Sequence, residues 1–335
     1  MVDTFIMTEP QVAPDGPAIA ALEPAVTAAA AAFSERVIRA SSVAAIEVAH
    51  ADFIGSRAVQ TARMFVDDVE AFRSLGAAAR RGFERFYEVC GTARHALTRP
   101  FGYPGDYAIL ELAYDQRPHA TSRTAAGRYS DAWFASAPLA QAVTARKDLL
   151  SSVLEERALA ATRPLRILSI AAGAARELRE MSPVALQNVE ATLVDRDPRP
   201  LEFARVSLDA AAPDHRVRTV IGDAIAGGDV VDAVGSDGPF DIIYSFGLFD
   251  YLSDDLLLHT VRNFLPLLAE GGQLIFCLKD RRHFDSLPAD WLYNWRFVAR
   301  TADDGPRLAS ALDLKVAQTW YVRDRCIAVW ACERR

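Results

Sequence analysis

The sequence predicts an α/β protein in which an N-terminal helical region precedes an open, mostly parallel β-sheet whose last strand is antiparallel. Two observations predict the sheet. After about Leu165, short apolar runs alternate with amphipathic segments, which is the pattern of strands joined by crossover helices. The last two runs, roughly 314–321 and 325–333, are separated by only three residues, which can form a hairpin but not a parallel crossover.

The N-terminal part of the chain is expected to be helical. From 17 to 93 it is rich in Ala, Glu, Arg and Leu, and apolar residues recur at helical spacing, as in Phe65, Val69 and Phe72. The segment 1–16 contains three prolines or glycines among polar residues, so we expect a flexible N-terminus there. The predicted organisation is therefore a flexible N-terminus (1–16), a helical region (17–128) and a sheet domain (129–335).

Two further features complete the expected secondary structure. The loop 99–107 reads RPFGYPGDY and contains two prolines and two glycines, which forbid a continuous helix. A helix resumes at Ala108. Strands that precede the final hairpin are expected at 165–171, 190–195, 217–221, 240–246 and 272–278.

Composition limits the classes of function. The 335 residues are 51% hydrophobic and 24% charged, with a net charge of −7 and no basic stripe, so we expect a soluble globular protein that does not bind nucleic acid. The four cysteines show no CxxC spacing, which favours buried thiols over zinc or disulfides, and we expect no metal and a reducing cytoplasm. No run approaches 18 apolar residues, so neither secretion nor a membrane span is expected.

The turn after the first predicted strand, Ala171 to Ala175, is a candidate ligand loop. In open α/β sheets, ligands bind at the carboxyl ends of the strands. Gly173 would let the backbone approach a ligand, and the following helix offers unpaired N–H groups. Ala171 and Ala175 stand where a dinucleotide fingerprint has glycines, so a ligand without a pyrophosphate is favoured. A plain strand-to-helix turn remains the alternative for this loop alone.

Acidic residues follow the second and third predicted strands. Asp195 lies 22 residues beyond Gly173 and could accept both hydrogen bonds of a ribose diol, with Arg196 beside it at the cofactor site. Asp197 could substitute for it or cap the next helix. After the third strand, Asp223 suits the exocyclic amine of adenine, and the Ala224 N–H could bond a ring nitrogen; a solvated turn aspartate is the alternative.

The fourth predicted strand leads into the expected substrate-facing loop, 245–251. We expect Ser245, Phe246 and Gly247 to lie at the ligand, and if that ligand is a methyl donor with a sulfonium group, they lie beside its methyl group. A sulfonium is attracted to ring faces, which gives Phe246 and Tyr251 a second role, although aromatic residues of this loop could equally belong to the core. The four loops together fit S-adenosylmethionine, and a sheet with a final antiparallel strand is the Rossmann-like arrangement found in class I methyltransferases.

Four segments resemble the bacterial methyltransferases of 3-hydroxypalmitic acid methyl ester biosynthesis, over roughly 95–335: FGYPGDY (101–107), LSIAAGAARE (168–177), YSFGLFDYL (244–252) and WLYNWR (291–296). The resemblance implies methyl transfer from S-adenosylmethionine to a small molecule, first of all to the carboxyl oxygen of a fatty or other organic acid. Methylation of a nitrogen or hydroxyl of a specialised metabolite is the alternative, and a non-catalytic binding module is a third. Two segments depart from the family pattern: AAG replaces a Cys-Gly-Pro turn, and FCLKD at 276–280 replaces a Gly-Asn-Phe ending.

The candidate catalytic residues depend on the acceptor. A carboxylate is already ionised and needs only positioning, whereas a hydroxyl, amine or ring nitrogen would use a base such as His283, Asp106 or Asp250. For His283 the alternative is a surface histidine.

The loop at 99–107 is expected to act as a lid or acceptor-binding segment. This role rests on the resemblance and on Tyr103, Asp106 and Tyr107, although structural loops use the same residue types. Arg146 could pair with the methionine carboxylate of the donor, or face solvent. A homodimer through the N-terminal helices is a further expectation.

Overall fold

The computed structural model describes residues 16–335, so the segment 1–15 of the expected flexible N-terminus lies outside the described residues. The chain divides into two compact units. The first contains Gln141–Phe284 and Phe297–Arg335, and the second contains residues 16–140 and Asp285–Arg296. The first unit carries the sheet and the second is helical, as the sequence predicts.

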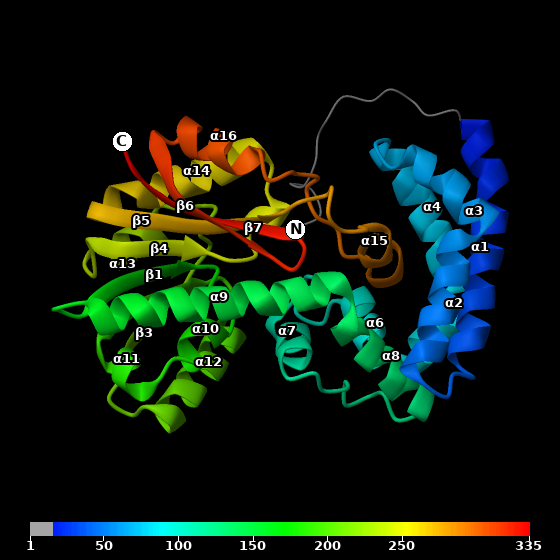
Figure 1. The fold of residues 1–335 in the computed structure, drawn as a ribbon, viewed down its shortest axis with the longest axis horizontal. Coiled ribbons are helices and arrows are strands. Elements are labelled where there is room, and N and C mark those ends of the chain that lie inside the picture. The colour runs from blue at the N-terminus through cyan, green and yellow to red at the C-terminus, as the bar shows by residue number, and fades with distance from the viewer. Residues whose placement is uncertain (1–15) are drawn as a thin grey trace. The chain divides into compact units, whose positions relative to one another are not determined.

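The sheet of the first unit has seven strands in the order β3-β2-β1-β4-β5-β7-β6 (Figure 1). β7 pairs antiparallel with both β5 and β6, whereas every other pair among β1 to β5 is parallel. This order confirms the predicted Rossmann-like sheet, which is mostly parallel with its last strand antiparallel. The strands are β1 (Leu165–Ile170), β2 (Val189–Asp195), β3 (Arg216–Ile221), β4 (Phe240–Ser245), β5 (Leu268–Lys279), β6 (Leu314–Val322) and β7 (Ile327–Arg334).

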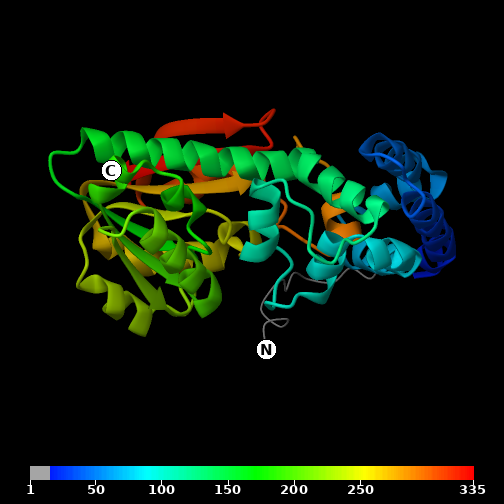
Figure 2. The ribbon, with the colours of Figure 1, turned by 90° about the horizontal axis from the view of Figure 1, so that it is seen from below.

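The two faces of the sheet are covered by different helices. On one face, α13 (Asp229–Gly235), α14 (Asp254–Phe264) and α16 (Asp304–Ala311) pack against a core that includes Ile243, Phe276 and Trp330. Side chains alternate along a strand, so Cys277 faces the opposite side, where it meets Arg146 of α9 (Pro138–Ala160). Figure 2 shows α9 running along the sheet. The remaining elements of this unit are α10 (Arg176–Arg179), α11 (Pro183–Gln187), α12 (Pro198–Ala211), η2 (Phe249–Tyr251) and η3 (Leu265–Leu267).

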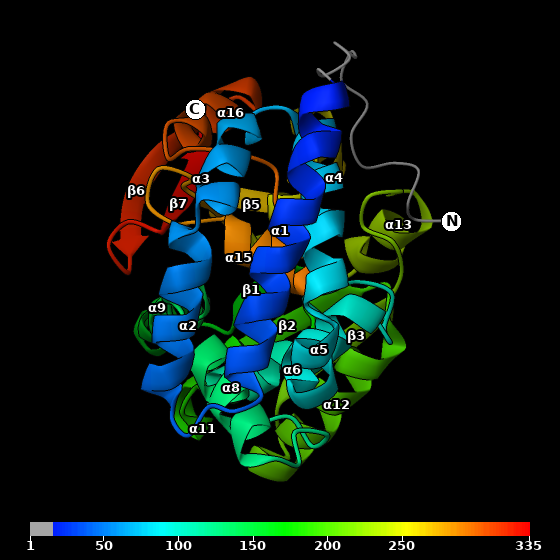
Figure 3. The same ribbon diagram turned by 90° about the vertical axis from the view of Figure 1, so that its right-hand side faces the viewer.

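The helical unit is built around α1, which packs against α2 and α4 (Figure 3). Gly82 permits the close approach of α1 and α4, because a Cβ there would lie 2.3 Å from the Thr27 carbonyl oxygen. Its core is aromatic and includes Phe33, Phe83 and Phe86. Its elements are α1 (Gly16–Val37), α2 (Val43–Gly55), α3 (Arg57–Ala62), η1 (Arg63–Phe65), α4 (Val69–Gly82), α5 (Glu84–Val89), α6 (Gly91–Thr98), α7 (Tyr107–Tyr114), α8 (Ala125–Ser136) and α15 (Leu287–Tyr293).

Helix α15 brings a later segment of the chain into the helical unit. The buried indole of Trp291 packs on Phe72 at a ring distance of 5.3 Å, and Tyr293 packs on Phe134 at 5.1 Å. The Tyr87 hydroxyl donates to the Leu292 carbonyl at 3.0 Å. These aromatic residues after β5 therefore serve core packing. Within residues 16–335, no helix is both long enough and apolar enough to cross a membrane.

Candidate functional site

The turn after β1 has a left-handed backbone at three of its five residues. The φ angles of Ala171, Gly173 and Ala175 are 55°, 53° and 45°. A Cβ built on Gly173 would have no atom within 4 Å, so this glycine serves the backbone conformation and leaves open space beside it. Ala171 and Ala175 adopt the conformation that glycine would hold without strain, and strain of this kind gathers at functional sites.

Asp195, the last residue of β2, is bonded to this turn. Its Oδ2 accepts from the Gly173 N–H at 2.8 Å, and its Oδ1 accepts from the Asp197 N–H at 2.9 Å. A carboxylate has about four acceptor positions, so two remain for a diol. The side chain is buried, and burial raises the pKa of Asp195. The Asp195 carboxylate, which is predicted to bind a ribose, is thus held in a fixed orientation beside the open face of Gly173.

Asp197 has a different partner set. Its Oδ1 accepts from the Arg199 N–H at 3.0 Å and caps α12, and both carboxylate oxygens bind the Arg199 guanidinium. Although burial opposes the effect, the hydrogen bonds from Arg199 lower the pKa of Asp197. Of the two acids, Asp195 is therefore the better ribose candidate, while Arg196 between them is exposed.

The end of β3 lies beside the end of β2. The Gly222 N–H donates to the Asp195 carbonyl at 2.9 Å, and a Cβ on Gly222 would lie 2.2 Å from Val230. Asp223 is exposed, and its Oδ1 accepts from the Ile225 N–H at 2.9 Å, whereas Ala224 is buried. The two residues expected to bind adenine, Asp223 and Ala224, therefore follow β3, which pairs with the strand that ends at Asp195.

The loop after β4 presents a polar group and a glycine. The Ser245 hydroxyl is buried and has no hydrogen-bond partner among the described residues. Gly247 has a φ of 131°, and a Cβ there would lie 3.5 Å from an Arg146 nitrogen. Phe246 is half-buried, with its ring centroid 6.1 Å from that of Tyr244.

In the second half of this loop, Asp250 binds two buried cations. Its Oδ2 binds the Lys279 ammonium and lies 3.3 Å from Arg146 Nη1, and its Oδ1 accepts from the Lys279 N–H. The Lys279 nitrogen lies 4.0 Å from the centre of the Phe297 ring. Burial lowers the pKa of Lys279, and Asp250 opposes that effect. Lys279, which sequence reasoning did not select, stands in the FCLKD segment where the family pattern is broken.

Arg300 fixes the backbone of the same turn. Its guanidinium donates to the carbonyl oxygens of Phe249 and Leu252 at 2.7 and 2.5 Å. The Val298 N–H donates to the Asp250 carbonyl at 2.8 Å, and the Tyr251 ring packs on Phe297 at 5.7 Å. The predicted acceptor loop is therefore rigidly held at its second half.

His283 lies in the same unit as Asp250 but is exposed. Its backbone N–H donates to the Asp280 carbonyl at 2.9 Å, in the turn that follows β5. The imidazole has no hydrogen bond to Asp250 or to any other described residue. The structure thus places this predicted base at the protein surface.

Asp106 belongs to the helical unit and is fully buried. Its Oδ1 accepts from the Ala108 and Ile109 N–H groups and caps α7, and its Oδ2 lies 2.7 Å from His95 Nε2. His95 Nδ1 in turn lies 3.2 Å from His119 Nε2. With both oxygens engaged, this carboxylate serves structure and is a poor candidate for a base.

The backbone N–H of Thr121 decides which nitrogens donate and which accept in the hydrogen bonds that link His119, His95 and Asp106. The Thr121 N–H donates to His119 Nδ1, so that nitrogen carries no proton, and neutral His119 donates from Nε2 to His95 Nδ1. His95 then donates from Nε2 to Asp106. Burial lowers the pKa of His119, and nearby His95 lowers it further. The hydrogen bonds of this network are therefore satisfied when His119 Nδ1 carries no proton.

The rest of the 99–107 loop is also packed within the helical unit. A Cβ on Gly105 would lie 2.1 Å from the Trp295 ring, so only glycine fits there. The Tyr107 ring packs on Phe101 at 5.4 Å, and Tyr103 is half-buried. The GDY motif is thus explained by packing and capping, and the acceptor role of Tyr103 and Tyr107 stays a prediction.

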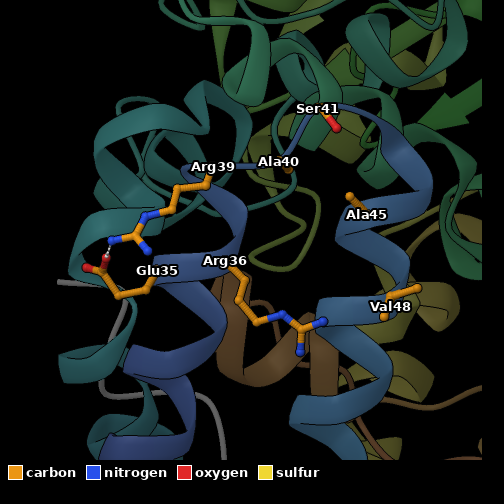
Figure 4. A pocket seen from close by; sticks show the side chains of 7 residues that line it. All are labelled: Glu35, Arg36, Arg39, Ala40, Ser41, Ala45 and Val48. Carbon is orange, nitrogen blue, oxygen red and sulfur yellow. Dashed lines mark hydrogen bonds and ion pairs between the residues drawn. The ribbon is translucent and has the colours of Figure 1, made fainter.

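A shallow groove lies between the end of α1 and α2 in the helical unit (Figure 4). Its two arginines are paired: Arg36 binds Asp52, and Arg39 lies 3.3 Å from Glu35. Paired surface arginines offer little to an anion, so we assign this groove no role.

No family model and no curated protein matches the chain. Similar solved structures include a possible exported protein of Bordetella parapertussis, with a TM-score of 0.57 and 15% identity over 97% of this chain and 99% of that one. This likeness shows a shared fold over nearly the whole chain.

Two methyltransferases are also similar over part of the chain. Magnesium protoporphyrin IX methyltransferase of Synechocystis PCC 6803 with bound S-adenosylhomocysteine has a TM-score of 0.46 and 11% identity, over 59% of this chain and 87% of that one. The 1,6-didemethyltoxoflavin-N1-methyltransferase of Burkholderia thailandensis has a TM-score of 0.42 and 17% identity, over 58% and 79%.

Proposed function

We propose that the protein is an S-adenosylmethionine-dependent methyltransferase that acts on a small molecule. The observation that carries this proposal is the bond between Asp195 and Gly173, which sets a buried carboxylate beside an open glycine at the carboxyl ends of β1 and β2. A dinucleotide is less well suited, because the methyl groups of Ala171 and Ala175 stand where a pyrophosphate needs glycine.

Different residues would bind different parts of the methyl donor, S-adenosylmethionine. The Gly173 turn would hold its methionine part, Asp195 its ribose and Asp223 its adenine, with Ser245 and Phe246 at its sulfonium end. The donor supplies an activated methyl group when bound. The protein's own contribution is to align the acceptor with that methyl group and to exclude water, which can supply much of the rate acceleration.

The acceptor atom that fits best is a carboxylate oxygen. Two buried cations, Lys279 and Arg146, bind Asp250 in the loop that should face the acceptor. Two positive charges on one carboxylate leave a net positive charge there, which favours an anionic substrate. A carboxylate needs no base. This agrees with the state of the candidate bases, because Asp250 is ion-paired, Asp106 is fully engaged and His283 is exposed.

The test is transfer of a labelled methyl group to a panel of carboxylic acids, alcohols and amines. We expect methyl esters as products, and we expect Lys279→Met to lower kcat/KM for acids by about tenfold or more, because a charge-assisted contact is lost. Lys315→Met on exposed β6 is the matched control and should leave the rate unchanged.

Three outcomes separate the parts of this proposal. Methylation of amines or alcohols alone would refute the carboxylate acceptor and retain the class of enzyme. Equal rates for the two lysine variants would refute the role of Lys279. Folded protein that binds neither S-adenosylmethionine nor its demethylated product would refute the methyltransferase itself.

A further inference from the structure

Glu177 is a buried acid without a counter-ion. It lies in α10, and its carboxylate makes no ion pair with any residue from 16 to 335. The two nearest cations are engaged elsewhere: Lys147 binds Asp148 and Glu180, and the Arg179 guanidinium lies 4.7 Å above the Phe203 ring. A buried carboxylate is costly unless it is paired, and burial raises the pKa of Glu177.

The Glu177 carboxylate is nevertheless held in one orientation. The Tyr244 hydroxyl, from β4, donates to its Oε1, and the Ser151 hydroxyl donates to the Glu177 carbonyl at 2.9 Å. Two bonds therefore fix both the side chain and the backbone, an arrangement that serves a group which must meet a ligand.

A second polar group without a partner lies next to this pair. The Ser169 hydroxyl is 1% exposed and has no hydrogen-bond partner among the described residues. Ser169 of β1 is in register with Tyr244 of β4, so both side chains lie on the same face of the sheet, near its carboxyl edge. An acid without a counter-ion and a hydroxyl without a hydrogen-bond partner at one place favour a ligand that donates hydrogen bonds and carries positive charge.

The position of this pair identifies the part of the donor that it would meet. Glu177 is two residues beyond Ala175, which ends the left-handed turn around Gly173. In the proposed function, on which this inference rests, that turn receives the methionine part of the donor. We propose that Glu177, oriented by Tyr244 and assisted by Ser169, binds the α-ammonium group of S-adenosylmethionine.

An ammonium group has three donors, and Glu177 and Ser169 offer acceptors for two of them. The Glu177 carboxylate accepts from the Tyr244 hydroxyl and from its own backbone N–H, which leaves about two of its four acceptor positions for the ligand, and the Ser169 hydroxyl can accept as well. The competing explanation is a structural pair in which protonated Glu177 is satisfied by Tyr244 alone. The two explanations differ in whether affinity depends on the amino-acid part of the ligand.

The experiment compares two ligands by titration calorimetry. S-adenosylhomocysteine carries the α-ammonium group, whereas 5′-methylthioadenosine has the same nucleoside and no amino-acid group. Glu177→Gln keeps the shape of the side chain and a partner for Tyr244. It should weaken S-adenosylhomocysteine by about 10-fold or more, the effect of a lost charge-assisted hydrogen bond, and change methylthioadenosine by less than about twofold.

Controls and a second variant keep the test decisive. Glu180→Gln changes another acid at the end of α10 and should leave both affinities unchanged. If Glu177→Gln does not fold, Tyr244→Phe takes its place: it should weaken S-adenosylhomocysteine selectively, because it frees the Glu177 side chain. Equal effects on both ligands, or no effect on either, would overturn the ammonium role while the methyltransferase stands. Wild-type protein that binds neither ligand would overturn both.

Discussion

At the scale of single residues, the turn after β1 shows how a nucleoside site can form with one glycine. Ala171 and Ala175 hold φ angles near those of Gly173, and an L-residue with a side chain is strained in that conformation by about 1–2 kcal/mol. The strain persists because β1 fixes the start of the turn and the bond from Gly173 to Asp195 fixes its middle.

Replacing either strained alanine by glycine should stabilise the protein. For Ala171→Gly or Ala175→Gly we expect the free energy of unfolding to rise by about 0.5–1 kcal/mol, less than the full strain because glycine also gains entropy in the unfolded chain. Urea unfolding measures the change. Ala172→Gly, at a residue without positive φ, is the control and should lower stability. A lower stability for all three variants would show that the turn is unstrained.

Sequence reasoning selects residues that patterns expose and does not select those whose significance depends on pairing. It selects Gly173 and Asp195 because strand ends meet at one edge of a parallel sheet and their spacing suits a ribose, and their role at the cofactor stays a prediction. It does not select Lys279 and Glu177, because their significance lies in burial and in the partners they have or lack. The sequence offers Asp106 as one of three possible bases, whereas its contacts with His95 and α7 engage both oxygens.

At the scale of elements, most strands were predictable within a few residues, since buried apolar runs delimit them. β5 is the exception: it begins at Leu268, four residues before the expected start, because Leu268 pairs with Phe240 across a bulge that includes two glycines. The place of α15 could not be foreseen, because its aromatic residues suit an acceptor pocket and a helical core equally well.

The GDY loop makes a prediction about its own packing. Gly105→Ala would place a methyl group 2.1 Å from the Trp295 ring, so we expect the helical unit to lose about 1–3 kcal/mol of stability. Thermal unfolding measures the loss. Gly102→Ala in the same loop is the control for strain without contact, because its φ is 93° and no atom lies within 4 Å of a Cβ. If both variants lose the same amount, the contact with Trp295 is unimportant.

At the scale of the whole molecule, stability should depend on pH through a buried histidine of the helical unit. His50, in the helical unit, has a buried Nε2 without a partner and packs on Trp133 at a ring distance of 4.9 Å. Burial lowers the pKa of His50 to about 4; Asp285 opposes this effect, and Arg63, which forms an ion pair with Asp285, lowers the pKa further.

The sign of the pH effect follows from this pKa. Between pH 4 and 6.5, unfolded His50 binds more protons than folded His50, so its contribution is fully present above pH 6.5 and is lost as the pH falls toward 4. The largest loss is about 3 kcal/mol. Chemical unfolding across this range should therefore show a smaller acid destabilisation in His50→Leu. His259→Leu, on an exposed position of α14, should behave as wild type. Identical pH profiles for wild type and His50→Leu would contradict the burial argument.

The central claim is that Asp195 and the Gly173 turn bind the nucleoside of S-adenosylmethionine, and calorimetric titration of S-adenosylhomocysteine into Asp195→Ala tests it most directly. Asp195 would make two hydrogen bonds to the ribose, so the variant should bind about 100-fold more weakly than wild type. Asp232→Ala, an exposed acid on α13, should bind as wild type. Equal affinity of Asp195→Ala and wild type, with both proteins folded, would contradict the account.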